Sequence, residues 1–195
     1  AGEAPVIFDK TKTEKSVARL KYFYFNKGFF DVKATFTFDS ISSKKGKVKY
    51  AVTPGKPYTI DSLKTSITTP ALDSLYKTAK ITSFIKSGKQ YKTEDFENEK
   101  NRITPHFRNN GVYHFQPNDV TFDIDTINKH NKANIDLAIR DYSYQEQDTT
   151  KTAPFKIYKI SAVNVFTDYS SSEADAKITD SISYKNFNLY SKKKL

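Results

Sequence analysis

The chain has 195 residues, no cysteine and a formal net charge of +10. The lack of cysteine excludes disulfides and thiolate metal sites, and no apolar run reaches the about 18 residues that a membrane-spanning helix needs. Fifteen Phe and 13 Tyr concentrate the hydrophobic content in large side chains, so that units of about 80 residues can still form cores.

The first predicted element is a helix over residues 9–27. Asp9 or Thr11 can cap its first turn, because such side chains accept hydrogen bonds from free backbone N–H groups. Apolar residues then recur at three- and four-residue spacing. Gly28 ends the helix, since glycine adopts the left-handed conformation of a helix C-terminus without a steric penalty.

Two strands are expected to follow the helix. Apolar and polar residues alternate over 30–38, which is typical of a half-buried strand and places Phe36 and Phe38 inward. Residues 42–46 read as a hairpin loop, and the alternation resumes on a returning strand over 47–52.

The next segment begins with another strand, over 58–67, and continues with a helix that starts at Pro70. A long helix is predicted from Thr93, as N-cap, to Gly111, since Glu94 and the acidic residues after it favour a helix N-terminus. Two more strands complete this segment, over 119–127 and 133–139.

The last part of the chain is less regular. Residues 144–152 are polar, residues 155–163 have the alternation of a first strand, and residues 168–180 are rich in Ser and Asp and are predicted to form a loop.

One pattern occurs twice along the chain. Arg19 precedes Gly28 by nine residues, Arg102 precedes Gly111 by nine residues, and the two copies lie 83 residues apart. Each copy is followed by two strand-like segments. A period of this size is typical of a tandem array of small domains. We therefore expect an α+β fold of β-α-α-β-β repeats, each a three-stranded sheet with helices on one face.

The repeat sets the expected domain boundaries. Residues 1–55 supply the C-terminal α-β-β part of one unit, residues 56–142 form a complete unit, and residues 155–195 begin a further unit.

This organisation resembles the POTRA domains of the Omp85 superfamily, which includes BamA and TamA. The resemblance rests on the element order, on the helix end at 24–32 with its equivalent at 107–113, and on the Pro54-Gly55 turn between units. The lead-in at 2–6 is similar to that of the Bacteroidetes TamA-like lipoproteins, TamL, in particular.

The resemblance implies a function without catalysis. Such a chain would lie on the periplasmic side of the Gram-negative outer membrane and receive unfolded β-barrel precursors or periplasmic assembly partners. A C-terminal β-barrel of the same protein would lie outside the 195 residues. No cofactor, nucleic acid or small-molecule substrate is implied.

A small sheet also offers a physical basis for binding. The unpaired N–H and C=O groups of an edge strand can accept an extended peptide as an additional strand, with little dependence on the sequence of the peptide. In POTRA domains the second strand is typically this edge, which implies edges at 33–41 and 119–127. The candidate binding residues are Lys33, Thr35, Thr37, Asp119, Thr121, Asp123 and Asp125.

Other chemistry is poorly supported. His106, His114 and His130 are spaced by 8 and 16 residues, which does not place them on one face of one element as a metal site requires. Asp123 and Asp125 share one side of a strand, but no histidine or nucleophile motif lies near them in the sequence. A solvated strand face explains this pair of carboxylates.

A basic nucleic-acid-binding repeat is the alternative from a different class. The segment 27–32 has a Lys-Gly-aromatic sequence like that of an RNA-recognition motif, but Phe30 stands where that motif needs a small residue. The net charge of +10 is also spread unevenly along the chain. Residues 56–154 carry 14 basic and 13 acidic residues, so this segment is nearly neutral. Phosphate binding instead predicts basic residues gathered on one face of each repeat.

Overall fold

A computed structural model describes residues 7–79, 82–127, 130–168, 170 and 177–194. The chain divides into two compact units, 1–155 and 156–195, which are described separately. Within the described residues no helix is long and apolar enough to span a membrane.

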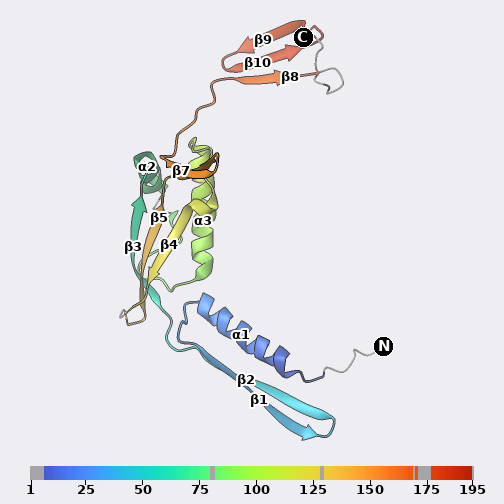
Figure 1. Cartoon of the computed structure of the whole chain (residues 1–195), viewed down its shortest axis with the longest axis vertical. Helices are drawn as coiled ribbons and strands as arrows, with labels where there is room; N and C mark the ends of the chain where they lie inside the picture. Colours follow the sequence, from blue (N-terminus) through green and yellow to red (C-terminus); the bar gives the residue numbers. More distant parts are fainter. Residues whose placement is uncertain (1–6, 80–81, 128–129, 169, 171–176, 195) are drawn as a thin grey trace. The chain divides into compact units, whose positions relative to one another are not determined.

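The first part of the larger unit consists of a helix and a hairpin (Figure 1). Helix α1 (Lys10–Asn26) begins as predicted at Asp9, whose carboxylate accepts the Lys12 N–H at 3.0 Å. Strands β1 (Lys33–Ser42) and β2 (Lys45–Thr53) pair antiparallel in a two-stranded sheet, so the connection is shorter than the predicted loop.

One expectation for this hairpin is wrong. Phe38 was expected to face inward, but its side chain is 41% exposed and stacks on Phe8 with ring centroids 4.1 Å apart. In this two-stranded sheet, Ala34 is the residue of β1 that is buried. The alternation along β1 therefore indicates a face that is only partly covered. Phe38→Ala removes fewer contacts than a Phe→Ala substitution in a buried core does.

The second part of the larger unit has the predicted β-α-α-β-β order. It contains β3 (Thr59–Ile67), α2 (Pro70–Ala79), α3 (Thr93–Asn109), β4 (Val120–Asp125) and β5 (Lys132–Ile139), with a 3-10 turn at Pro117–Asp119 before β4. The strand order is β3-β5-β4, in which β5 runs parallel to β3 and antiparallel to β4. The expected α+β fold is confirmed.

The core lies between this sheet and its two helices (Figure 1). Alternate residues of β5 are buried, as expected for a strand with one covered face. Leu137 of β5 is 0% exposed and belongs to one core cluster with Tyr76 of α2 and Phe107 of α3. Ile135 of β5 is 1% exposed and belongs to a second cluster with Phe96 of α3. The opposite face of the sheet is open.

Helix α3 contains one departure from the sequence prediction. Lys92, not Thr93, is the N-cap, and it makes no side-chain capping bond. The Thr93 hydroxyl instead donates to the Asn26 side-chain oxygen at 3.2 Å, which joins α3 to the end of α1.

Gly28 lies at the junction between the two parts of this unit. As predicted, Gly28 and Gly111 both end helices with positive φ, at 86° and 90°. The Gly28 carbonyl accepts the Tyr58 N–H at 2.8 Å, and the Gln90 side chain donates to the Lys27 carbonyl at 2.7 Å. A Cβ on Gly28 would lie 2.6 Å from the Tyr91 carbonyl oxygen. The junction therefore requires glycine for conformation and for space.

A buried ion pair holds the connection between α2 and α3. Glu99 is fully buried, and its carboxylate accepts bonds from Arg102 at 2.6 and 3.1 Å and from the Phe84 N–H at 3.0 Å. Arg102 also donates to the Ala79 carbonyl at 2.9 Å. Burial, and secondly the negative charge of Glu99, raises the pKa of Tyr76 to about 12, so that this phenol stays neutral.

Two hairpins after β5 were not predicted. Strands β6 (Tyr142–Glu146) and β7 (Thr149–Ala153) form a two-stranded sheet. The smaller unit is a three-stranded sheet of β8 (Val163–Phe166), β9 (Asp180–Tyr184) and β10 (Phe187–Ser191) in the order β8-β10-β9. The strand expected over 155–163 is wrong, since residues 154–162 contain no strand. Much of the loop expected over 168–180 lies outside the described residues.

The glycine junction generates a first prediction. Gly28→Ala should lower the free energy of unfolding by about 2–4 kcal/mol, because it combines backbone strain with a clash against Tyr91. Gly88 is the matched control, since its φ is 81° but an added Cβ meets nothing within 4 Å. Gly88→Ala should therefore cost only about 1–2 kcal/mol. Equal losses in urea unfolding would show that the junction is not tightly packed.

The buried ion pair generates a second prediction. Glu99→Ala should destabilise the protein by about 3–5 kcal/mol, because it leaves the Arg102 charge and the Phe84 N–H without their acceptor. Glu97 serves as the control, since its pair with Lys100 is 63% exposed on the Glu side. Glu97→Ala should cost less than about 1 kcal/mol. Chemical unfolding of both variants measures the difference, and similar small losses would contradict the role assigned to Glu99.

Candidate strand-docking site

The two edges of the β3-β5-β4 sheet differ. The outer edge of β3 is covered at its beginning by residues 87–91: the Ile60 N–H donates to the Lys89 carbonyl at 2.8 Å, and the Ile60 carbonyl accepts the Gly88 N–H at 2.7 Å. The Ser87 hydroxyl adds a bond to the Asp61 carbonyl at 2.6 Å. Strand β4 pairs with β5 on one side and with no other strand of the described chain.

The orientation of the β4 backbone follows from the bonds of β5. The carbonyl of Asn131, just before β5, accepts the Thr59 N–H, and the carbonyl of Ile139 accepts the Thr68 N–H. The backbone N–H and C=O groups of the odd-numbered residues of β5 therefore point toward β3. Backbone groups alternate along a strand, so even-numbered residues such as Ala138 face β4. Thr121 is the register partner of Ala138, and its hydroxyl donates to the Ala138 carbonyl at 3.3 Å. Thr121 therefore directs its backbone N–H toward β5.

The backbone N–H and C=O groups of β4 that point away from β5 belong to its even-numbered residues. Val120, Phe122 and Ile124 direct their backbone N–H and C=O groups away from β5. The Val120 N–H is already bonded to the Pro117 carbonyl. Phe122 and Ile124 thus carry the backbone groups available to an added strand.

A groove of about 470 Å³ lies beside this edge. It lies between β4 and α3, and part of its wall is aromatic: the Phe96 ring of α3 meets Phe122 of β4 edge-on, with centroids 5.0 Å apart. The residues that line the groove are Tyr91, Thr93, Phe96, Lys100, Asn118, Val120, Thr121, Phe122 and Ile124.

The aromatic wall continues into the Gly28 junction. Tyr91 lies 5.0 Å from Phe96 and 4.9 Å from Phe30, and Phe30 lies 4.7 Å from Tyr58 (all between ring centroids). Burial raises the pKa of Tyr91, which keeps its ring in the neutral form. One row of rings therefore connects Phe30, which lies between α1 and β1, to the docking edge.

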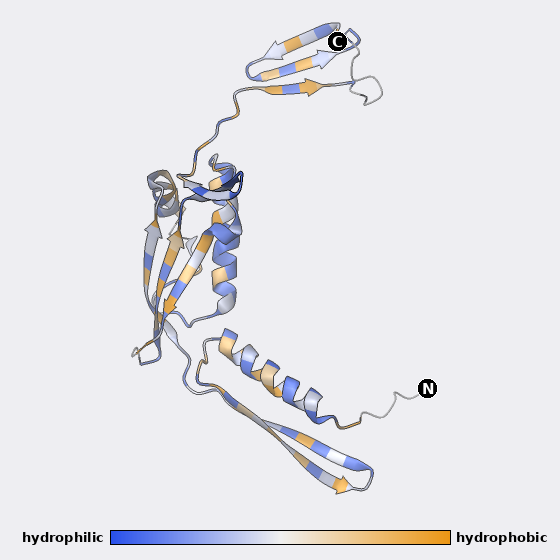
Figure 2. Ribbon diagram, in the orientation of Figure 1, coloured by the Kyte–Doolittle hydropathy of each residue, from blue (hydrophilic) through white to orange (hydrophobic). Residues whose placement is uncertain are grey.

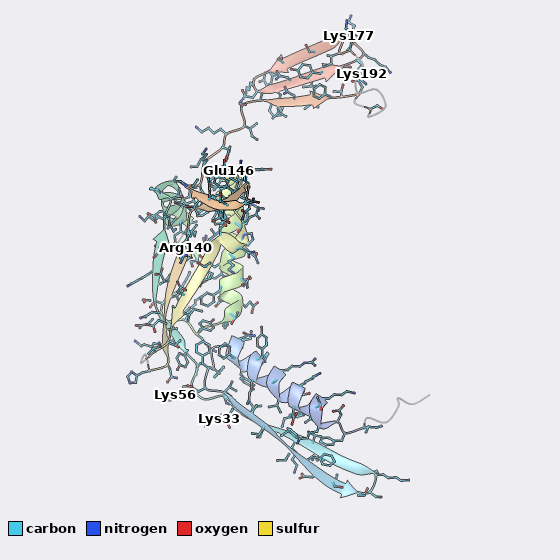
Figure 3. All side chains as sticks on the ribbon, in the orientation of Figure 1. Lys33, Lys56, Arg140, Glu146, Lys177 and Lys192 are labelled. Atoms are coloured by element: carbon cyan, nitrogen blue, oxygen red, sulfur yellow. The ribbon has the colours of Figure 1, made fainter. Side chains whose placement is uncertain are left out.

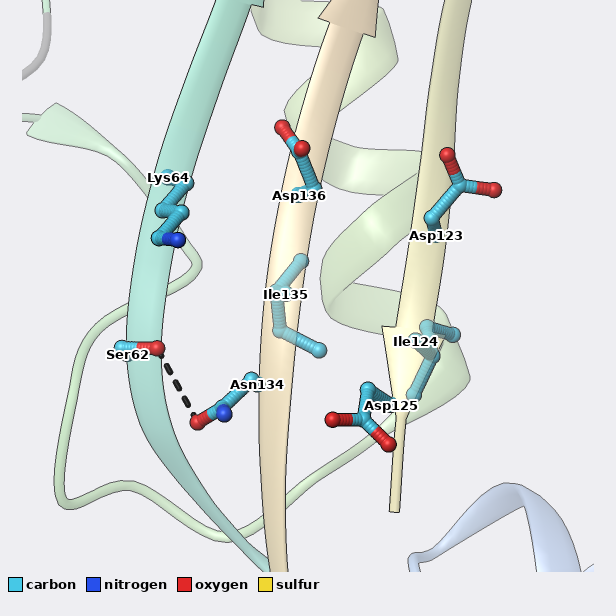
Figure 4. Close-up of a pocket in the computed structure, with 8 residues that line it drawn as sticks. All are labelled: Ser62, Lys64, Asp123, Ile124, Asp125, Asn134, Ile135 and Asp136. Atoms are coloured by element: carbon cyan, nitrogen blue, oxygen red, sulfur yellow. Dashed lines mark hydrogen bonds between the residues drawn. The ribbon is translucent and has the colours of Figure 1, made fainter. Parts of the chain in front are cut away.

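The sheet face opposite the helices is acidic. Asp123 and Asp125 of β4 and Asp136 of β5 project from this face, together with Lys64 and Asn134 (Figure 4). Bands of hydrophobic and hydrophilic residues alternate along β4 (Figure 2), which matches its two faces. A phosphate-binding face needs positive charge, whereas these three carboxylates are negatively charged. Among the described residues, no three His, Asp or Glu side chains form a group that could hold a metal ion.

The predicted binding residues do not form one cluster. Thr121, Asp123 and Asp125 lie on β4, whereas Lys33, Thr35 and Thr37 lie on β1 of the separate two-stranded sheet, with Lys33 at its start (Figure 3).

Asp119 precedes β4 and is not part of the strand on which the sequence pattern placed it. It lies in the 3-10 turn before β4, where its carboxylate accepts the Gln116 N–H at 2.7 Å. Burial raises the pKa of this carboxyl, against the opposing effects of that hydrogen bond and of Arg108. Asp119 therefore shapes the turn that leads into β4.

Sequence reasoning also missed groups that define the site. Phe96, Tyr91 and Lys100 were not identified as groove residues. Thr121 was predicted as a binding residue without a direction for its N–H, whereas the register gives the outward N–H groups to Phe122 and Ile124. The signal for Phe96 was its place three residues after the start of α3, on the side of the apolar stripe.

Comparison with known proteins gives likenesses of backbone arrangement. No family model matches the chain, and no curated protein matches it. Among solved structures, BamA from Haemophilus ducreyi lacking POTRA domains 1–3 is similar over 73% of this chain, with 13% identity and a TM-score of 0.42. Haemophilus influenzae BamA POTRA3–5 is similar over 87% of it, with 14% identity and a TM-score of 0.40.

The matches cover different shares of those two chains, 25% and 60% respectively. They concern BamA structures, and neither points to the TamA-like lipoproteins in particular.

Proposed function

We propose that this chain is a POTRA-type scaffold of an outer-membrane protein assembly factor, and that it binds extended segments of β-barrel precursors or assembly partners on the periplasmic side. The proposal rests on the repeated β-α-α-β-β pattern and on one structural observation. That observation is an edge strand, β4, with outward backbone groups beside an aromatic groove. In this proposal residues 1–55, 56–142 and 155–195 are parts of three such repeats.

The binding mode follows from backbone chemistry. A strand added along β4 can exchange hydrogen bonds with the N–H and C=O groups of Phe122 and Ile124. Alternate side chains of that strand then lie over the groove between β4 and α3. Main-chain pairing is tolerant of sequence, which suits a receptor for many client proteins. The covered beginning of β3 directs such addition to β4.

Proline substitutions at two neighbouring positions test this mode. Ile124→Pro should weaken binding of an extended barrel-strand peptide about 5- to 10-fold, because it deletes one outward donor and leaves the β4–β5 hydrogen bonds intact. Ile124→Ala keeps the N–H and removes a side chain that is 40% exposed, so it should reduce affinity about 2-fold or less.

Thr121→Pro gives the complementary result. It deletes an N–H directed at β5, so it should lower stability by about 1–3 kcal/mol. NMR titration and thermal unfolding of the three variants provide the measurements. Equal losses of affinity in Ile124→Pro and Ile124→Ala, or chemical-shift changes confined to the outer faces of the helices, would contradict strand addition at β4.

A further inference from the structure

The carboxylates of β4 lie where they contact an added strand. Asp123 directs its backbone toward β5, so an antiparallel strand on the outer edge would face it across a position without backbone hydrogen bonds between the two residues. Side chains approach most closely at such positions. The residue of the added strand opposite Asp123 would therefore project next to the Asp123 carboxylate.

Acidic side chains outnumber basic ones around Asp123: of the residues that line this face, Asp123, Asp125 and Asp136 are acidic and Lys64, the register partner of Asp136 on β3, is basic. The register partner of Asp123 on β5 is Asp136, and like charges directly opposite on a sheet are destabilising. The described part of the chain gives Asp123 no salt bridge, whereas Asp136 accepts a hydrogen bond from Ser66 at 3.0 Å. A cationic side chain on the added strand would relieve this repulsion.

The two faces of the added strand meet different surroundings. Residues opposite Phe122 and Ile124 would project toward α3, where Phe96 and Tyr91 line the groove. The residue between them would project onto the open face beside Asp123, which Figure 4 shows on the side away from the helix. The site therefore favours an added strand that has apolar side chains at every second position and a cationic side chain at the position between them.

We infer that the β4 edge selects extended strands in which aromatic residues alternate with Lys or Arg, the aromatic side chains over the α3 groove and a basic side chain next to Asp123. This inference rests on the proposed strand addition and specifies the class of strand that it favours. The same carboxylates disfavour strands with acidic residues at the intervening positions, including a second β4 strand.

Three capped nonapeptides test the inference. They share alternating Phe and Tyr and differ only at the intervening positions, which are Gln, Lys or Glu. At low ionic strength the Lys peptide should bind about 10-fold more tightly than the Glu peptide, with the Gln peptide between them. The difference should shrink to less than about 2-fold in 1 M NaCl, where the Debye length is about 3 Å. The net charge of +10 alone favours the reverse order.

Matched variants locate the effect. Asp123→Asn should reduce the Lys-to-Glu ratio of affinities about 3-fold. Asp148→Asn changes the net charge equally, in the turn between β6 and β7, and should leave the ratio unchanged.

Two outcomes separate the inference from the proposed function. Failure of the Gln peptide to perturb Phe122 and Ile124 in an NMR titration would overturn strand addition itself. Binding of the Gln peptide with equal affinities for the Lys and Glu peptides, or equal effects of the two Asp variants, would overturn the charge selection and leave strand addition standing.

Discussion

A three-stranded sheet has backbone groups along its two edges that it cannot satisfy by itself. Strand β5 bonds on both sides, and each of its neighbours is left with one outer row of N–H and C=O groups. Leaving such groups unpaired away from water is costly, and leaving them exposed invites another strand. The protein treats the two rows differently. The beginning of the β3 row is bonded to residues 87–91, whereas the β4 row lies open beside a groove.

This asymmetry is maintained from within the fold. The connection between α2 and α3 covers β3, and Glu99 fixes that connection through Phe84 and Arg102. The other end of the same connection carries Tyr91, whose ring contacts the groove residue Phe96 and the junction residue Phe30. The backbone of Tyr91 leaves no space for a side chain at Gly28. The groove, the covered edge and the Gly28 junction therefore share one segment, residues 82–91.

The fold was predictable to the extent that local rules determine it. The positive φ of Gly28 and Gly111 and the β-α-α-β-β order follow from helix-ending glycines and from hydrophobic periodicity. The β6–β7 and β9–β10 hairpins were missed because each strand has only five residues, too few for alternation to stand out, and β7 has almost no apolar residue. Phe38 was placed inward because alternation distinguishes the two faces of a strand but does not say whether another element covers either of them.

The candidate site was predictable only in outline. Sequence reasoning placed an edge at β4, but the direction of each N–H depends on the register with β5, and a shift of one residue reverses it. The outward groups belong to Phe122 and Ile124, neither of which was among the predicted binding residues. The groove was missed because Tyr91, Phe96 and Phe122 are separated in sequence and meet only when α3 packs on the sheet. Glu99 carries no sequence signal that distinguishes it from its exposed neighbours on α3.

Amide hydrogen exchange at single residues tests whether β4 is the open edge that accepts an added strand. In the free protein we expect slow exchange at Thr121 and Asp123, whose N–H groups point toward β5, and fast exchange at Phe122 and Ile124. A saturating extended peptide of alternating aromatic and Lys residues should slow exchange at Phe122 and Ile124 at least about 10-fold, as expected when an exposed N–H becomes hydrogen-bonded. Slow exchange at these two residues in the free protein, or protection by the peptide only along β3 or the helices, would contradict the claim.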